Sequence, residues 1–416
     1  MMLMRWLLAS LITATGTVHA LQPLQPSNPP GLLATEVARP LMAQDPRVAT
    51  ARLGLELARQ ESHILEKSPY EWTGKVLGQR RTLEAGPRYN EWNVGVERTI
   101  RLPDKGAADR NIGKGTVEES EARYGEALHE SARELFALWL DWLAAERGRE
   151  LAEANLQAVQ ENLKSVDKRI RAGDASKLDL NFAGAELAEQ KRMNNDVQIQ
   201  AETAWARLST RFPGIDRQSA VLPSVRLIVE DEALWRDRIF AESDDLKVVQ
   251  SQLRIAQARA DRVQAERVPD PTFGVYTASE VGGRERISGI TLSIPLPGGL
   301  RDVRSAKALT AVEVARSTVD LKKREIETEI AAALVTARGT YESLQIAKEG
   351  ALVMQENAKL VQRAYLLGEG DLQTLLLVRR QTIAAENSAL FAQLGALKAY
   401  FRLLIDAHLI WDLEKE

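Results

Sequence analysis

The sequence predicts a mostly α-helical protein with a small β part, built by tandem duplication of a helix-strand-strand-long helix-helix unit. Three observations support this fold class. Ala, Leu, Glu, Gln, Arg and Lys dominate, and aromatic residues make up only 5% of the chain, which favours long helices. The two halves of the chain share internal similarity. Two long segments without proline each end at a glycine followed by an acidic residue.

The charge balance and the absence of cysteine exclude several classes of function and site. The 416 residues include 55 basic and 58 acidic side chains, so the totals give no support for a nucleic-acid partner. The sequence contains no cysteine, and we therefore expect no disulfide, no thiolate metal site and no lipid-modified N-terminal cysteine.

The N-terminal segment, residues 1–20, has the form of a secretory signal peptide. A positive charge at Arg5 precedes an apolar run, and small residues lead to a cleavage point after Ala20. The apolar run is shorter than the roughly 20 residues that a spanning helix needs, so we expect cleavage and export. We expect no other stretch to be a transmembrane helix, and a membrane location would then require a β-barrel.

The internal repeat appears at two related shifts. A shift of 200 aligns "DPRVATARLGLELARQ" at Asp45 with "DLKVVQSQLRIAQARA" at Asp245, and a shift of about 195 aligns Gly173 with Gly368. Helix, strands, long helix, reversal and helix recur in the same order, which favours duplication over chance similarity between Ala-rich helices.

This order predicts the following organisation: a signal peptide at 1–20; a Pro-rich extended segment at 21–35; a first repeat at 36–212, with strands at about 70–80 and 90–102 and a long helix at about 116–172; a linker or equatorial segment at 213–240; a second repeat at 241–405, with strands at about 271–279 and 286–296 and a long helix at about 302–367; and a C-terminal tail at 406–416.

The predicted strands alternate apolar and polar residues. In "NEWNVGVERTI", Trp92, Val94 and Val96 lie on one side, and Arg98 interrupts that apolar side near one end. Each strand has about ten residues, the length that crosses a bilayer when tilted. Because bacterial barrels have at least about eight strands, a barrel would need several subunits. Two ordinary hairpins packed on a soluble core are the alternative.

The two long helices are the stronger signal. At 1.5 Å per residue they would be about 85 and 100 Å long, far beyond an ordinary globular helix. Their apolar stripes are narrow and rich in Ala, so neighbouring subunits would have to supply further contacts. A coiled-coil rod is the alternative.

Both long helices are predicted to end in a sharp reversal. Gly173 and Gly368 can adopt the left-handed conformation that ends a helix, and Ser176 and Asp371 can cap the returning helices. In a ring of subunits, the acidic residues near the reversals would form a rim that attracts cations. These residues are Asp174, Asp179, Glu369 and Asp371.

Together with the signal peptide and the two repeats, the reversals "RAGDASKLDL" and "YLLGEGDLQTLL" resemble those of the TolC-like outer-membrane efflux proteins. The resemblance implies a homotrimer in outer-membrane lipid, with a 12-stranded transmembrane β-barrel on a long periplasmic α-helical barrel. It also implies a passive conduit that serves a periplasmic adaptor and an inner-membrane RND-type pump.

The resemblance places the reversals at the periplasmic tip, where the adaptor binds and the pore can narrow. The implied tip residues are Gly173, Asp174, Asp179, Gly368, Glu369 and Asp371. One departure stands in "DLQTLLLVRR", where Thr374 and Leu377 replace an acidic pair that the family pattern would suggest.

The stretch "PDPTFGVYTASEVGGRERISGITLSIPLPGG" from Pro269 is most similar to the CzcC-type branch, which implies heavy-metal cations such as cobalt, zinc, cadmium or copper as substrates. A channel for drug efflux or type I protein secretion is the alternative within the family. A periplasmic adaptor, which would have one helical hairpin rather than two, and a coiled-coil structural protein are alternatives outside it.

No motif predicts an enzyme, a cofactor or a bound metal. The sequence contains no nucleophile elbow and no phosphate-binding glycine loop. His63, His129 and His408 are isolated in the sequence and lack the spacing of metal ligands.

Overall fold

The computed structural model describes residues 29–217, 221–296 and 298–413. The predicted signal peptide lies outside these residues, as does most of the Pro-rich segment. The described elements follow one another as α1 Thr35–Ala43, α2 Pro46–Glu66, β1 Thr73–Thr82, β2 Arg88–Thr99, α3 Pro103–Ala172, α4 Lys177–Arg211, α5 Glu232–Glu242, α6 Asp244–Ala265, β3 Thr272–Glu280, the 3₁₀ turn η1 Val281–Gly283, β4 Glu285–Ser293, α7 Leu300–Leu367 and α8 Leu372–Asp406.

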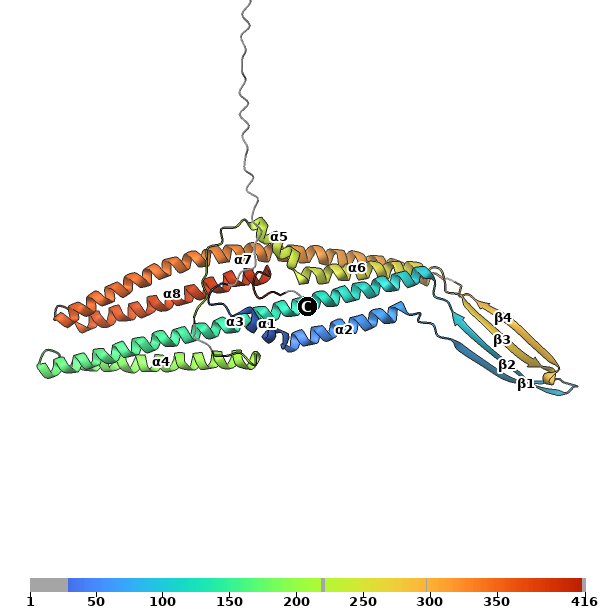
Figure 1. Cartoon of the computed structure of the whole chain (residues 1–416), viewed down its shortest axis with the longest axis horizontal. Helices are drawn as coiled ribbons and strands as arrows, with labels where there is room; N and C mark the ends of the chain where they lie inside the picture. The colour runs from blue at the N-terminus through green and yellow to red at the C-terminus, as the bar shows by residue number, and fades with distance from the viewer. Residues whose placement is uncertain (1–28, 218–220, 297, 414–416) are drawn as a thin grey trace, which may run out of the picture.

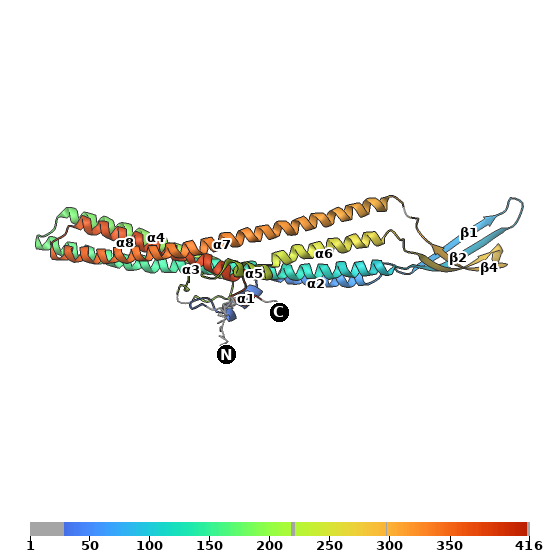
Figure 2. The same cartoon turned by 90° about the horizontal axis from the view of Figure 1, so that it is seen from above.

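The molecule is elongated, with helices along most of its length and a sheet at one end (Figures 1 and 2). The hairpins α3–α4 and α7–α8 lie side by side and reach the end opposite the sheet. The 70 residues of α3 and the 68 of α7 make each helix about 100 Å long. The prediction of a mostly helical fold with a small β part is confirmed.

The described elements repeat as the duplication predicts: α2-β1-β2-α3-α4 is followed by α6-β3-β4-α7-α8. The four strands form one antiparallel sheet in the order β1-β2-β3-β4. The halves meet in this sheet, where Val96 of β2 lies opposite Val275 of β3. They also meet along α3, which packs on α6 and α8. The observed strands differ from the predicted ranges by a few residues at their ends.

The first long helix begins earlier than predicted, at Pro103 rather than near residue 116. Gly106, Gly113 and Gly115 weaken the helical signal there, because glycine is a poor helix former. The fold uses two of them for close approach. A Cβ on Gly113 would lie 2.6 Å from Oγ of Ser62 in α2, and a Cβ on Gly115 would lie 2.7 Å from Cγ1 of Ile255 in α6. Packing between helices therefore outweighs the local preference.

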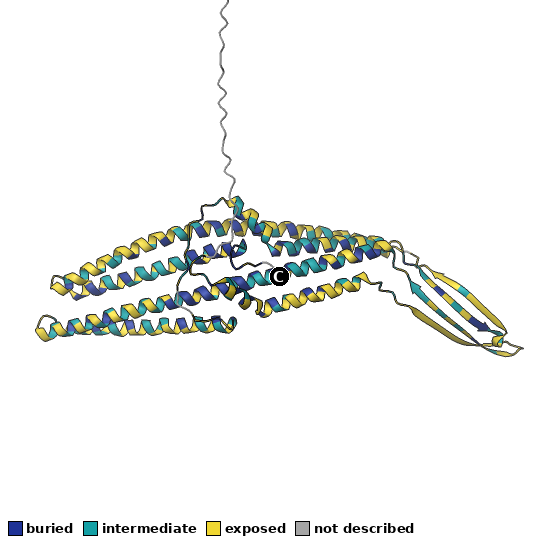
Figure 3. Cartoon of the chain, in the orientation of Figure 1, coloured by how far each residue is buried: buried dark blue, intermediate teal, exposed yellow. Residues whose placement is uncertain are grey.

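One face of the sheet is apolar and uncovered in the single chain. Cross-strand pairing places Val76 opposite Val94, and Val275 opposite both Val96 and Ile290, so these side chains share a face. Val76 is 81% exposed and Ile290 is 83% exposed. Figure 3 shows that the strands are largely exposed while buried residues gather among the helices. The alternative expectation, in which the two hairpins pack on a soluble core, is therefore wrong.

The opposite face of the sheet is polar. Lys75 Nζ lies 2.6 Å from a carboxylate oxygen of Glu97 on the adjoining strand. Nearer the strand turns, Arg81 Nε lies 3.1 Å from Glu91, and its NH2 group lies 3.0 Å from Glu280 on β3. One guanidinium thus bridges three strands, and the ion pairs of the sheet lie on the face opposite the valines.

The sheet is attached to the helices by side chains that reach across the junction. Asp270 accepts hydrogen bonds from Tyr70 Oη at 2.8 Å and from the backbone N–H of Leu102 at 3.0 Å, and it pairs with Lys105 Nζ at 2.9 Å. Both charged side chains are nearly inaccessible to solvent. This contact joins segments from both halves.

The two repeats end their first helices in the same way. Arg101 donates to the carbonyl oxygens of Leu65 and Glu66 at the end of α2, both at 2.9 Å. In the second repeat, Arg301 donates to the carbonyl oxygens at the end of α6. Each arginine satisfies helix-end carbonyl groups that have no partner within their helix.

The largest buried cluster lies at the middle of the molecule. Phe136 of α3 stacks on Phe401 of α8 with ring centroids 4.9 Å apart, and Trp411 of the tail donates from Nε1 to the carbonyl oxygen of Leu33 at 2.8 Å. The predicted equatorial segment, residues 213–240, includes most of the short helix α5, and Trp235 of α5 is fully buried in the same cluster. The equatorial segment and the C-terminal tail thus pack into the central buried cluster and contribute to its stability.

Helix α8 corrects the expectation that only the N-terminal segment is apolar enough to resemble a spanning helix. Among the described residues, α8 contains an 18-residue window with a mean hydropathy of 1.2. Its apolar residues pack in the central cluster through Leu397 and Leu404 and near the hairpin tips through Leu372 and Leu375. We therefore attribute the hydropathy of α8 to packing against other helices.

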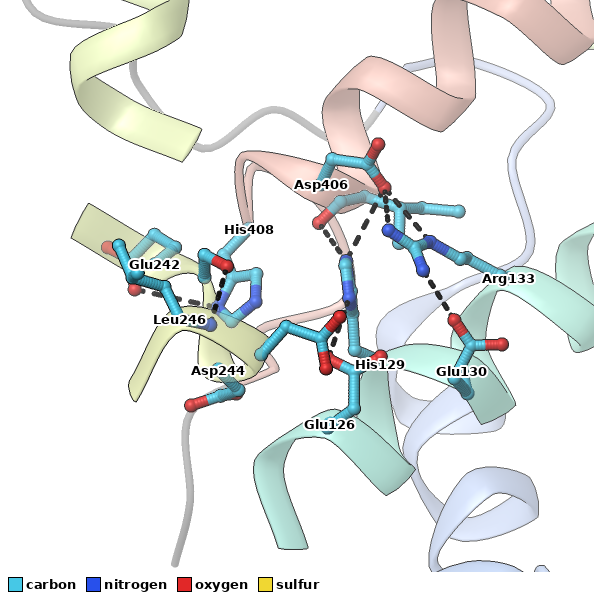
Figure 4. A network of polar contacts seen from close by, with 12 residues as sticks. Glu126, His129, Glu130, Arg133, Glu242, Asp244, Leu246, Asp406 and His408 are labelled. Carbon is cyan, nitrogen blue, oxygen red and sulfur yellow. Dashed lines mark hydrogen bonds and ion pairs between the residues drawn. The ribbon is translucent and has the colours of Figure 1, made fainter. Parts of the chain in front are cut away.

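The structure also corrects the reading of the histidines as isolated. His129 of α3 and His408 of the tail lie together, with ring centroids 5.3 Å apart (Figure 4). His129 Nε2 donates to the carbonyl oxygen of Ile405 at 3.2 Å, and His408 Nδ1 lies 3.6 Å from Glu242. Within the described part of the chain, no group of three or more His, Asp or Glu side chains is arranged to hold a metal ion.

Burial lowers the pKa of His408 from 6.5 to about 4. Electrostatic interactions with His129, Lys247 and Arg238 lower the pKa of His408 further, and the interaction with Asp244 raises it. The neutral ring is therefore the form that this central site accepts.

We expect Gly113→Ala to destabilise the protein by about 1 to 3 kcal/mol, because its Cβ would overlap the side chain and approach the backbone of Ser62. Gly148→Ala is the matched control in α3, since a Cβ there meets nothing within 4 Å. It should be neutral or stabilising by up to about 1 kcal/mol. Thermal unfolding followed by circular dichroism measures both, and equal midpoints for the two variants would contradict the close approach.

Stability should fall as the pH drops from about 6.5 to 4. The folded-state pKa of His408 lies below its unfolded value, so the unfolded chain binds more protons in this range. The loss should reach about 3 kcal/mol at the acid end. His408→Asn should flatten this dependence, since Asn tolerates the positive φ of 52° at this position. Unfolding midpoints between pH 4 and 7.5 test this, with exposed His63→Asn as a control that should behave as wild type.

Candidate functional site

The two reversals have the same backbone geometry. Gly173 ends α3 with φ 88° and ψ 4°, and Gly368 ends α7 with φ 80° and ψ 9°. The N–H groups of Asp174 and Glu369 each donate to the carbonyl oxygen five residues earlier, at 2.8 and 2.9 Å. These are the bonds of a left-handed glycine cap, as the sequence predicts. The two reversals lie at the same end of the molecule (Figures 1 and 2).

Two of the predicted tip acids cap the returning helices. Asp179 and Ser176 form a capping box at the start of α4, with hydrogen bonds of 2.9 and 3.2 Å between side chain and backbone. Asp371 accepts from both the N–H and the hydroxyl of Thr374 at 2.8 Å at the start of α8. The backbone N–H of Thr374 holds the pKa of Asp371 below its usual value. Thr374, which departs from the expected acidic pattern, thus completes a cap.

The other two acids are presented to solvent. Asp174 and Glu369 are exposed, and neither forms an ion pair or a side-chain hydrogen bond with another described residue. They are therefore carboxyl groups that a cation or a basic partner surface can approach. The structure thus divides the four predicted acids into two caps and two exposed carboxylates.

Beneath the reversals, apolar side chains join the two hairpins. Val166 of α3, Tyr365 of α7 and Leu375 of α8 belong to one buried cluster. Arg169 of α3 donates to the carbonyl oxygen of Tyr365 at 3.2 Å, and its guanidinium carbon lies 4.8 Å from the centroid of the Tyr365 ring. This cation–π contact links the hairpins immediately below their tips.

Two further arginines cross between the hairpins. Arg380 of α8 pairs with Glu186 of α4 at 2.5 Å, and Arg379 of α8 donates to the carbonyl oxygen of Ala158 in α3 at 2.9 Å. Glu186 is only 3% exposed, and it also accepts a hydrogen bond from Gln190 at 3.2 Å. Sequence reasoning gave these arginines and Arg169 no role. The available signal was a pair of arginines directly after the apolar run "LLLV".

A family model described as Outer membrane efflux protein matches residues 39–211, nearly the whole first repeat. A comparison with curated protein sequences finds no match.

Several solved structures share the fold at low sequence identity. The outer membrane channel CmeC of Campylobacter jejuni is similar with a TM-score of 0.74 and 14% identity, over 92% of this chain and 86% of that one. The MtrE outer membrane channel of Neisseria gonorrhoeae in its open state gives 0.72 and 18%, over 95% and 99%. CusC, described in connection with transmembrane channel formation, gives 0.64 and 16%, over 93% and 97%.

These similarities extend over both repeats, including the sheet and the two helical hairpins. The chain thus matches the outer membrane efflux protein model over its first repeat and shares the fold of these outer membrane channels over more than nine tenths of its length.

Proposed function

We propose that this chain is the outer-membrane channel subunit of a tripartite efflux system. It would passively conduct substrate from an inner-membrane RND-type pump and a periplasmic adaptor to the exterior. The observation that carries the proposal is the four-stranded sheet, which has an uncovered apolar face on one side and ion pairs on the other, attached to helices about 100 Å long. An apolar outside and a polar inside are what a membrane barrel needs.

The open edges of the sheet support a homotrimer as the proposed assembly. The outer strands of the sheet, β1 and β4, each have one neighbour in the chain. In a closed ring, β1 of one copy pairs with β4 of the next, so that no strand edge remains unpaired. Three copies of four strands make a 12-stranded barrel, within the range of bacterial outer-membrane barrels. The helices of the three copies would then surround a periplasmic tunnel.

The hairpin tips are the proposed adaptor contact. They lie farthest from the sheet, and their rigid glycine reversals present Asp174 and Glu369 to solvent. Threefold repetition would place six such carboxylates around the tunnel end. They can bind a basic adaptor surface or constrict the pore electrostatically. Asp179 and Asp371 support the rim by fixing the returning helices.

We further propose heavy-metal cations as substrates. The proposal rests on the similarity of the segment from Pro269 to the CzcC-type branch and on the exposed tip acids. A conduit needs no tight metal site, because conducted ions must leave it. Conduction of larger organic compounds or of unfolded protein is the outcome that would favour drug efflux or type I secretion.

We expect the purified full-length protein to form discrete, cation-preferring channels in a planar bilayer. Replacing both exposed tip acids in Asp174→Lys/Glu369→Lys should reduce or reverse the cation preference, because six charges in the ring would change sign. Arg192→Ala is a control on the exposed surface of α4. A wild-type protein that stays soluble without detergent and never conducts would instead indicate an adaptor or a rod.

Gly368→Pro should abolish efflux in cells while the oligomer still assembles. Proline fixes φ near −65° and cannot adopt the φ of 80° that this reversal requires. Metal tolerance of a strain carrying the variant measures efflux, and gel migration without heating measures assembly. Gly339→Ala, in the middle of α7 with nothing near its added Cβ, is the control. Normal metal tolerance with Gly368→Pro would remove the tip from the proposal.

A further inference from the structure

A charged side chain lies on the apolar face of the sheet at the end next to the helices, whereas the other arginines of this face, Arg80, Arg88 and Arg286, lie nearer the strand turns. Arg98 belongs to β2 and faces Phe273 across the β2–β3 pair, on the same face as Val96 and Val275. It lies near the end of β2 that leads into α3, so it marks the boundary between the apolar face and the helices.

The surroundings of Arg98 supply an aromatic partner but no counter-charge. Its guanidinium carbon lies 5.5 Å from the centroid of the Trp72 ring, and the Trp72 side chain is 67% exposed. The ion pair nearest in the sequence, Lys75 with Glu97, lies on the opposite face. Across the described ranges, Arg98 forms no ion pair with a carboxylate. Its charge is therefore available to a partner outside the chain.

We propose that Arg98 and Trp72 bind the phosphate of a glycerophospholipid in the leaflet next to the helices. This inference rests on the proposed function, which turns the apolar face toward lipid. An unpaired guanidinium is costly in hydrocarbon, and at the rim of the apolar face it can reach the headgroup layer. The planar guanidinium donates two parallel hydrogen bonds to phosphate oxygens, and indole rings favour the same interfacial layer.

The apolar side chains next to Arg98 offer a surface for the acyl chains of the lipid. Val96, Val275 and Ile290 continue the same face away from the helices, and Val275 and Ile290 are more than half exposed. An acyl chain can lie along these side chains while its phosphate meets Arg98. The site therefore fits a phospholipid better than a free phosphate ion, which would leave the apolar strip uncovered. A trimer would carry three such sites at one depth, which would fix its height in the bilayer.

The test is native mass spectrometry of the full-length protein in nonionic detergent, titrated with dioleoylphosphatidylglycerol. Arg98→Gln should weaken binding about tenfold, as expected for loss of charge-assisted hydrogen bonds. Arg98→Lys and Trp72→Ala should each have a smaller effect, because they remove the planar fork and the stacking partner. Lys75→Gln is the matched control, which removes one positive charge from the polar face near the same end and should bind as wild type.

Two ligand controls separate the contribution of the lipid phosphate from that of the acyl chains and from binding of free phosphate. Dioleoylglycerol, which lacks phosphate, should bind wild type and Arg98→Gln equally, and inorganic phosphate should not displace the lipid. Equal lipid affinity in wild type and Arg98→Gln, an equal loss in Lys75→Gln, or displacement by inorganic phosphate would each overturn the site. Bilayer conductance of the same samples separates the two proposals: conduction with unchanged lipid affinity in Arg98→Gln rejects the lipid site alone, whereas absence of wild-type conduction rejects the channel.

Discussion

The buried carboxylate of Asp270 is the contact on which the relation between sheet and helices depends. It gathers a lysine, a tyrosine hydroxyl and a backbone N–H from the first half of the chain at the point where the second half enters the sheet. Removing two charges from water is unfavourable unless their hydrogen-bonding capacity is used. Here three donors converge on one carboxylate, so the pair can fix the direction in which four strands leave the helical body.

The same junction shows what duplication preserves. Arg101 and Arg301 end α2 and α6 by donating to their last carbonyl groups, although few residues are identical between the halves. The requirement is physical: a helix that stops at the base of a sheet leaves carbonyl groups without partners, and a long flexible donor from the following segment satisfies them. Similar reversals at Gly173 and Gly368 meet the equivalent requirement at the other end.

How well the sequence predicts each feature depends on whether its cause is local. The reversals could be predicted because glycine and a capping side chain encode them within ten residues. The start of α3 could not, because its glycines weaken the local helical signal, and the close approach of Gly113 to Ser62 of another helix is not visible in the local sequence. The meeting of His129 with His408 depends on how the tail folds back on α3. At the candidate site, the positions of the acids could be predicted, but their division into caps and exposed charges required the backbone. Adaptor binding at the tip stays a prediction.

The uncovered face of the sheet has a consequence for how the protein reaches its final state. A single copy exposes Val76, Val275 and Ile290 to water, together with two unpaired strand edges. In the proposed channel, burial of this surface against other copies and lipid supplies the stabilising free energy, so the stability of the sheet depends on the concentrations of both. Before they meet, the same strands can pair with any exposed edge. In the proposed channel, folding of the sheet and assembly of the copies are therefore one coupled equilibrium.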